Sequence, residues 1–186
     1  MLLSLIVTAL PVLFLAGLIQ KGLAFRRRHV EMDGDPPIAK GLFASSKWAI
    51  VVVWGAMVVQ SWSDRLSFID VPDLLAGVSL GLWAVGFALL FAGRSGLGDS
   101  FRIGSPKERT GLKQTGLFRF SRNPMYVGVY ATLCATVLRT LNPVLLLVAV
   151  YVIAVHHRIV LAEEAHLRHV FGEEYRTYCS RVRRYV

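Results

Sequence analysis

Apolar positions along the chain gather in long segments without charge, and the charged positions fall between those segments. The two longest, residues 2–20 and 74–93, contain no Asp, Glu, Lys or Arg. At about 1.5 Å per residue, each is long enough to cross a hydrocarbon core of roughly 30 Å as a helix. Three shorter uncharged segments complete a set of five: residues 48–63, 123–138 and 140–157. The pattern predicts an all-α integral membrane protein with five transmembrane helices.

Composition supports this class. Of the 186 residues, 54% are hydrophobic and 18% charged, and the mean hydropathy is +0.52, which excludes a typical soluble domain, a disordered chain and a collagen-like chain. The net charge of +9 would suggest nucleic acid in a soluble protein, but here it raises the question of which membrane face the charges occupy. We expect one membrane domain over residues 1–186, with three helices in 1–93 and the chemistry in 94–186.

The basic residues are distributed very unevenly between the loops. Of the 21 Lys and Arg residues, 19 fall in the first loop, the third loop and the C-terminal tail. The positive-inside rule assigns these three segments to the cytoplasm. Arg26, Arg27 and Arg28 follow the first apolar segment and no basic residue precedes it, so we expect an uncleaved helix with the N-terminus outside. A bacterial inner membrane is the expected location.

The last two predicted spans form a hairpin, because only a tight turn separates them and Pro143 suits the first turn of a helix. The third loop and the tail therefore leave the membrane side by side. An amphipathic cytoplasmic helix is predicted for the tail, with Gly172 able to break it. Its inward stripe, spaced by three or four residues, consists of Val160, Glu164, Leu167, Phe171, Tyr175, Tyr178 and Val182.

The start of the fourth span is a candidate anion-binding point. Asn123 is a good N-cap and Pro124 a good first helical residue, so free backbone donors are expected to face the third loop. A helix N-terminus attracts anions, and Arg122 adds a positive charge beside it. The alternative is a capped membrane helix with an arginine that reaches to the interface.

Aromatic and small residues follow in the same span. Tyr126 and Tyr130 lie four residues apart on one helical face, whereas Gly128 points elsewhere and allows a neighbouring helix or a ligand to approach closely. Tyrosines in this position either contact a ligand or belong to an interfacial aromatic belt. The sequence leaves both interpretations open.

Two adjacent acids lie where the fifth span leaves the membrane. Glu164 interrupts the apolar stripe, and Glu163 is its neighbour. An unpaired charge at membrane depth costs roughly 3 kcal/mol at the centre and less near the interface, so an inward acid needs a partner or a function. Arg122, Arg158 and Arg168 are candidate partners. The alternative is an interfacial cluster of salt bridges.

No metal site is predicted. The histidines at 156, 157, 166 and 169 lack a zinc-ligand spacing, since adjacent histidines point apart on a helix and no third ligand stands at a suitable distance. Nucleotide-binding glycine fingerprints are also absent from the sequence. We therefore expect neither a metal nor nucleic acid as a partner.

Two segments together carry a resemblance to a known family. Arg-Asn-Pro-Met-Tyr-Val-Gly at residues 122–128 opens the hairpin, and Glu163-Glu164-Ala165-His166-Leu167 follows it, with Phe171-Gly172-Glu173-Glu174-Tyr175 further on. In order and spacing this resembles the isoprenylcysteine carboxyl methyltransferases, a branch of the integral-membrane methyltransferases that includes phospholipid methyltransferases. The resemblance covers roughly residues 112–182. Asn123 stands where that family usually has His, and Arg183 where it usually has Pro.

The resemblance implies an S-adenosylmethionine-dependent enzyme with its cofactor pocket on the cytoplasmic side and a lipophilic or amphiphilic acceptor, possibly a carboxylate, entering from the bilayer. Glu163 would orient Arg122, and Arg122 would hold an anionic acceptor. Two other classes stay open: an NAD(P)H-dependent membrane reductase of the sterol-reductase type, and a non-catalytic membrane scaffold. By position, Arg122 and Glu163 would lie nearest the methyl acceptor, while Leu112, Gly116, Asn123, Tyr126 and Glu164 would line the cofactor pocket.

Overall fold

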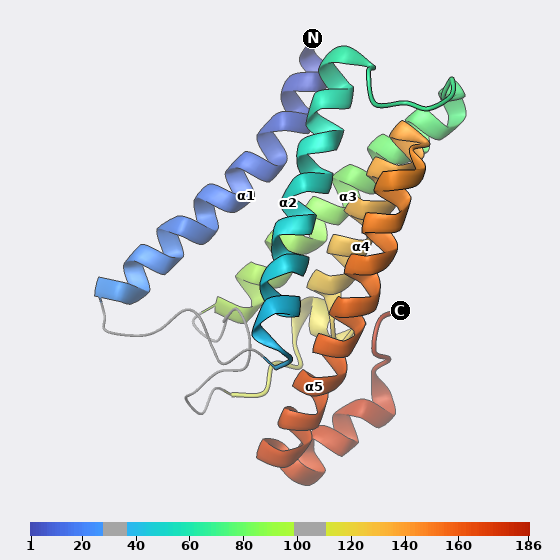
Figure 1. The fold of residues 1–186 in the computed structure, drawn as a ribbon. Coiled ribbons are helices and arrows are strands. Elements are labelled where there is room, and N and C mark those ends of the chain that lie inside the picture. Colours follow the sequence, from blue (N-terminus) through green and yellow to red (C-terminus); the bar gives the residue numbers. More distant parts are fainter. Residues whose placement is uncertain (28–36, 99–110) are drawn as a thin grey trace.

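The computed structural model describes residues 1–27, 37–98 and 111–186, and these residues form a helical bundle (Figure 1). This confirms the predicted all-α class for the part of the chain that is described. A short 3-10 helix, η2, precedes the fourth long helix. The elements are α1 (Leu2–Arg27), α2 (Lys40–Ser63), α3 (Asp73–Leu97), η2 (Gly116–Arg119), α4 (Pro124–Thr140) and α5 (Pro143–Arg181).

Four of these helices are long and apolar enough to cross a membrane: α1, α2, α3 and α5. Their outward faces carry large apolar side chains, such as Leu13 and Leu147, which are exposed in the isolated chain and suited to lipid. Helix α4 has 17 residues, fewer than the roughly 20 that a typical crossing needs. The chain therefore fits an integral membrane protein, and the crossing expected for residues 123–138 stays a prediction.

Helices α3 and α4 pack most closely, through two glycines. A Cβ added to Gly128 would lie 2.7 Å from the Gly86 carbonyl oxygen, and one added to Gly86 would lie 2.8 Å from the Gly128 carbonyl oxygen. Small residues at such a crossing allow two membrane helices to bring their backbones together. The space beside Gly128 is thus occupied by a neighbouring helix, which is one of the two possibilities that the sequence left open.

Aromatic packing joins the remaining helices around this pair. Phe14 of α1, Trp54 of α2 and Phe87 of α3 pack against one another with ring centroids 4.9 to 6.2 Å apart. Trp54 Nε1 also donates a hydrogen bond to Thr132 Oγ1 of α4 at 2.9 Å. The starts of α2 and α4 lie at the same end of the bundle as the C-terminal part of α5 (Figure 1). The first, third and last polar segments therefore meet at one end, as the charge distribution predicts.

The α4–α5 hairpin is as tight as expected. Leu141 adopts a left-handed conformation with φ 45°, and Pro143 occupies the first turn of α5. Asn142 caps that helix, because its side-chain oxygen accepts hydrogen bonds from the Val144 and Leu145 amides at 2.9 and 3.3 Å. This turn aligns the two helices that carry the candidate site.

The tail differs from the separate amphipathic helix that the sequence suggests. Helix α5 continues without interruption from the apolar segment to residue 171, and only Gly172 leaves helical geometry, with φ 50° and ψ −120°. Glycine tolerates this conformation because it has no Cβ. Beyond it a second helical stretch folds back toward the bundle (Figure 1). The predicted stripe does face inward: Tyr175, Tyr178 and Val182 are buried and pack with Leu112, Leu167 and Phe171.

Candidate functional site

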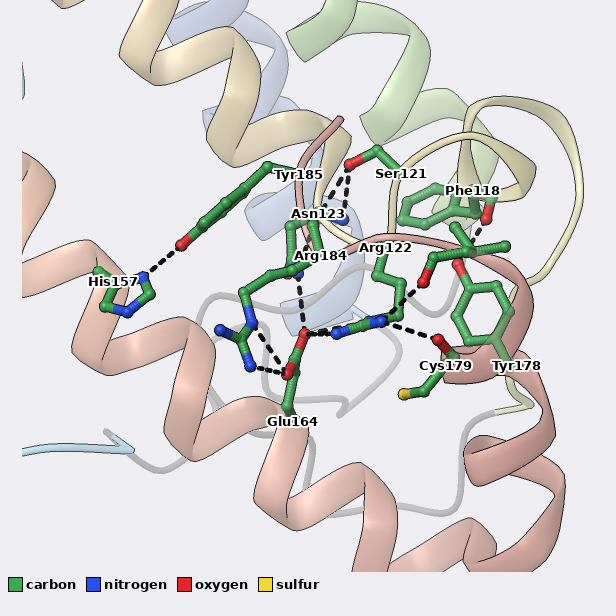
Figure 2. A network of polar contacts seen from close by, with 11 residues as sticks. Phe118, Ser121, Arg122, Asn123, His157, Glu164, Tyr178, Cys179, Arg184 and Tyr185 are labelled. Atoms are coloured by element: carbon green, nitrogen blue, oxygen red, sulfur yellow. Dashed lines mark hydrogen bonds and ion pairs between the residues drawn. The ribbon is translucent and has the colours of Figure 1, made fainter.

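The site begins where the chain end pairs with the turn that precedes α4. The Arg122 amide donates a hydrogen bond to the Arg183 carbonyl at 3.0 Å, and Ser121 and Arg183 form an isolated parallel bridge. Tyr178 donates its hydroxyl proton to the Phe118 carbonyl in the same turn. The Tyr185 hydroxyl lies 2.8 Å from His157 Nδ1 and so joins the chain end to α5. Figure 2 shows how these residues gather around the start of α4.

At the centre of this region Glu164 binds two arginines (Figure 2). Its Oε1 accepts hydrogen bonds from Arg122 Nε at 3.1 Å and Nη2 at 2.9 Å, and its Oε2 accepts from Arg184 Nε at 3.1 Å and Nη2 at 2.9 Å. Asn123 Nδ2 adds a longer contact of 3.4 Å to Oε1. The remaining Arg122 nitrogen, Nη1, donates to the Val182 carbonyl at 2.6 Å. Every oxygen of Glu164 and every guanidinium nitrogen of Arg122 is therefore engaged within the protein.

Burial makes this cluster electrostatically strong. The Glu164 side chain is 2% exposed and Arg122 10%, whereas Arg184 is 32% exposed. Charge-assisted hydrogen bonds of this kind are among the strongest side-chain interactions. Glu163 and Glu164 lie beyond the uncharged segment of α5, which ends at His157. Burial alone raises the pKa of Glu164, but the hydrogen bonds from Arg184 and Arg122 outweigh that effect and lower the pKa below its usual value.

The neighbouring acid, Glu163, has different surroundings. It accepts a hydrogen bond from the Tyr126 hydroxyl, which lies 3.1 Å from both carboxyl oxygens. Burial raises the pKa of Glu163 to about 7, and the hydrogen bond from Tyr126 only partly offsets that effect. A carboxyl group with this pKa changes its charge near neutral pH, which is typical of groups at functional sites.

Glu163 and Tyr126 line a cavity of about 460 Å³ between α1, α2, α4 and α5. Most of the wall is apolar, with Phe14 and Leu15 from α1, Trp54 from α2 and Val129 from α4. Pockets of this size and character hold small organic ligands in many proteins. Among the described lining residues Glu163 is the only acid. The polar lining residues are Lys47, Arg122, Asn123, Tyr126, His156 and Glu163.

Comparison with known proteins identifies the family. A sequence model of the phospholipid methyltransferases matches residues 74–174, which is more than half of the chain. The chain belongs to the phospholipid methyltransferase family. This group is part of the integral-membrane methyltransferases that the motifs at residues 122–128 and 163–167 resemble, so the predicted relationship is confirmed. No curated protein and no solved structure matched the chain.

The matched region contains all seven residues that the sequence singles out, and the structure brings them to one end of the bundle. Four of them, Arg122, Asn123, Tyr126 and Glu163, line the cavity of this phospholipid methyltransferase family member. Glu164 lies behind that wall in its arginine cluster. Leu112 packs against the apolar side of the tail, and Gly116 begins η2 with φ 62°.

Two expected contacts differ from the observed ones. Arg122 pairs with Glu164 and not with Glu163, because Glu163 points toward Tyr126. Asn123 occupies the N-cap position of α4, but its side chain makes no cap hydrogen bond. Its amide nitrogen instead donates to the Arg184 carbonyl at 3.1 Å. The side chain of Asn123 thus binds the end of the chain and does not cap α4.

Sequence reasoning missed Arg184, the second partner of Glu164. Arg184 belongs to the basic end of the tail and turns inward to Glu164. The signal that could have found it is the pairing need of Glu164 together with the chain reversal at Gly172. His156 and Lys47 were also not connected with the site. Within the described ranges, no group of three His, Cys, Asp or Glu side chains is arranged to hold a metal.

Proposed function

We propose that this protein transfers a methyl group from S-adenosylmethionine to a lipophilic or amphiphilic acceptor at the cytoplasmic face of the membrane. The observation that carries the proposal is the cavity wall: most of it is apolar, and Arg122, Asn123, Tyr126 and Glu163 form a polar group at and after the start of α4. A molecule with a hydrocarbon part and one polar reactive group fits such a wall.

The chemistry requires little from the protein besides placement. When bound, the sulfonium of S-adenosylmethionine supplies an already activated methyl group. The protein has to align the acceptor with that group and keep water away, and needs neither a metal nor a covalent nucleophile for this. The cation fits the residues present, because the Glu163 carboxyl faces the cavity and can carry a negative charge near neutral pH.

We assign roles to the seven residues, and their contacts support these roles. Glu163 and Arg122 lie nearest the acceptor, and Tyr126 fixes the Glu163 carboxyl through its hydroxyl. Glu164 acts by holding Arg122, since its oxygens are occupied by two guanidinium groups. Gly116 and Leu112 contribute backbone and apolar surface to the cofactor side, next to the loop that leads into α4. Asn123 joins both sides, because it lines the cavity and binds the chain end.

Binding of S-adenosylhomocysteine, followed by calorimetry with the full chain in detergent, tests the cofactor assignment. Folded protein without detectable binding would argue strongly against it. The reductase alternative is tested in parallel by thermal stabilisation, because only a true ligand raises the melting temperature by linkage. We expect stabilisation by S-adenosylhomocysteine and none by NADPH.

Transfer of labelled methyl from S-adenosylmethionine into extracted membrane lipids and membrane-soluble small molecules tests the reaction. Glu163→Gln is expected to lower the transfer rate at least tenfold, since it removes the charge that faces the cavity. Glu173→Gln is the matched control, because Glu173 is 80% exposed and pairs only with Arg176 on the surface among the described residues. The scaffold predicts no methyl transfer above background by the unaltered protein. Equal loss in both variants, or full activity in both Glu163→Gln and Arg122→Ala, would argue against the roles assigned to these residues.

A further inference from the structure

His156 is a buried histidine in the cavity wall that the proposed reaction does not use. Its side chain lies on α5 and is 6% exposed. Nδ1 lies 2.9 Å from the Val152 carbonyl oxygen. A carbonyl oxygen only accepts hydrogen bonds, so Nδ1 carries the proton, and in the neutral ring Nε2 keeps a lone pair. The ring thus presents a hydrogen-bond acceptor on the edge opposite its backbone contact.

Among the residues that the structure describes, no donor forms a hydrogen bond with His156 Nε2. The nearest aromatic group, Tyr126, meets the ring edge to face at 5.7 Å and donates its hydroxyl proton to Glu163. The polar side-chain atoms that are sealed from solvent without a partner in the described part of the chain are Arg94 Nε and Tyr130 Oη. Since His156 lines the cavity and its Nε2 is not one of these sealed atoms, the lone pair is accessible from the cavity.

The position of His156 relative to Glu163 indicates which part of a ligand this acceptor would contact. The two residues are seven positions apart on α5, so both can face the same side of the helix, and both line the cavity. At about 1.5 Å per residue, seven positions correspond to roughly 10 Å along the helix axis. When the reactive atom of a ligand lies beside Glu163, the part of the ligand that lies beside His156 is therefore about 10 Å from the reactive atom.

We propose that His156 is a specificity-determining residue, and that it selects acceptors with an O–H or N–H donor in their apolar part, about 10 Å from the methylated atom. The assignment rests on the proposed function, because it takes Glu163 as the end at which methyl transfer occurs. The ligand class is an amphiphile with a hydroxyl or amide group within its chain. A chain of pure hydrocarbon leaves Nε2 without a partner in an apolar wall, which weakens its binding.

Two substitutions separate this role from a structural one. The amide oxygen of Gln in His156→Gln reaches the place of Nε2, so this variant keeps an acceptor toward the cavity. The amide nitrogen of Asn in His156→Asn lies near the place of Nδ1, so this variant keeps the donor to the Val152 carbonyl and loses the cavity acceptor. The melting temperature without ligand shows which variant perturbs folding.

The probes are 1-dodecanol and 1-methoxyundecane, which have the same number of heavy atoms and differ in the O–H donor. Binding is measured by melting-temperature shifts of the full chain in lipid nanodiscs. We expect the alcohol to bind about fivefold more tightly than the ether in the unaltered protein and in His156→Gln, and equally in His156→Asn. Equal binding of both probes to the unaltered protein overturns the proposal. So does a preference that persists in His156→Asn, or the absence of binding by either probe.

S-Adenosylhomocysteine binding, measured on the same samples, keeps the two proposals apart. The His156 variants are expected to bind it as the unaltered protein does, because His156 lies about 10 Å deeper than Glu163. If the unaltered protein binds S-adenosylhomocysteine but shows no preference for the alcohol, the role of His156 alone is refuted. Failure of S-adenosylhomocysteine to bind the unaltered protein refutes the proposed function, whatever the probes do.

Discussion

Replacing Glu164 by Gln tests whether the arginine cluster holds the tail onto the start of α4. The substitution keeps the size of the side chain but removes the charge that Arg122 and Arg184 share. Breaking a buried ion pair typically costs 3 to 5 kcal/mol, because the partner charge is left uncompensated. Arg184 is 32% exposed and recovers part of its hydration, so the lower end, about 3 kcal/mol, applies here. For a chain of this size, that corresponds to a fall in melting temperature of roughly 6 to 12 °C.

The assay is thermal unfolding of the full chain in detergent at pH 6, followed by intrinsic fluorescence. Glu163→Gln is the matched control, because Glu163 is adjacent in sequence and largely neutral at that pH, and the Gln amide oxygen can still accept the Tyr126 hydroxyl proton. We expect it to change stability by less than about 1 kcal/mol. Equal shifts for the two variants, or a fall below about 2 °C for Glu164→Gln, would show that the cluster does not hold the site together.

Three further predictions concern stability. The raised pKa of Glu163 means that the folded chain binds more protons than the unfolded chain between pH 4.5 and about 7, so stability falls across this window as the pH rises. Glu163→Gln should remove that part of the pH dependence, which melting curves at pH 5 and pH 8 measure. Gly128→Ala should cost roughly 3 kcal/mol, because its Cβ would meet the Gly86 backbone, and a melting temperature within 2 °C of the unaltered protein would contradict the close packing. Gly172→Ala should cost about 1 to 2 kcal/mol because of the positive φ. Gly77→Ala, in an open helical position, should not lower the melting temperature in the same assay, because alanine favours a helix over glycine by up to about 1 kcal/mol.

The helices could be predicted because one property of the sequence indicates a membrane-spanning segment: the absence of charged residues over a sufficient length. Residues 2–20 and 74–93 show it clearly, and α1 and α3 contain them. The helix start at Pro143 and the helix break at Gly172 could also be predicted, because the proline backbone is restricted and the glycine backbone is unusually free. The crossing by α4 was less certain from the same property, because 17 residues lie near the lower limit of length.

The pairing within the site depends on tertiary structure and was not predictable in detail. Successive residues on a helix point about 100° apart, so Glu163 and Glu164 necessarily face different surroundings. Which of them meets Arg122 depends on how α5 is rotated against α4. Arg184 reaches Glu164 only because the chain reverses at Gly172 and returns along the turn before α4. Gly172 indicates where the chain can reverse, but no local pattern in the tail shows which segment the returning chain contacts.

Glu163 and Glu164 have different surroundings, and this difference has a chemical consequence. Arg122 and Glu164 neutralise each other in a cluster that Arg184 completes, so their charges serve mainly to hold the wall in place. The charge that can change at the cavity is therefore that of Glu163, whose carboxyl is bound by an uncharged hydroxyl. A fixed ion pair there would keep the same charge throughout a reaction cycle. A carboxyl with a pKa of about 7 can be neutral while an apolar molecule enters and negative when a cation lies beside it, and this property suits the methyl transfer from a sulfonium that we propose.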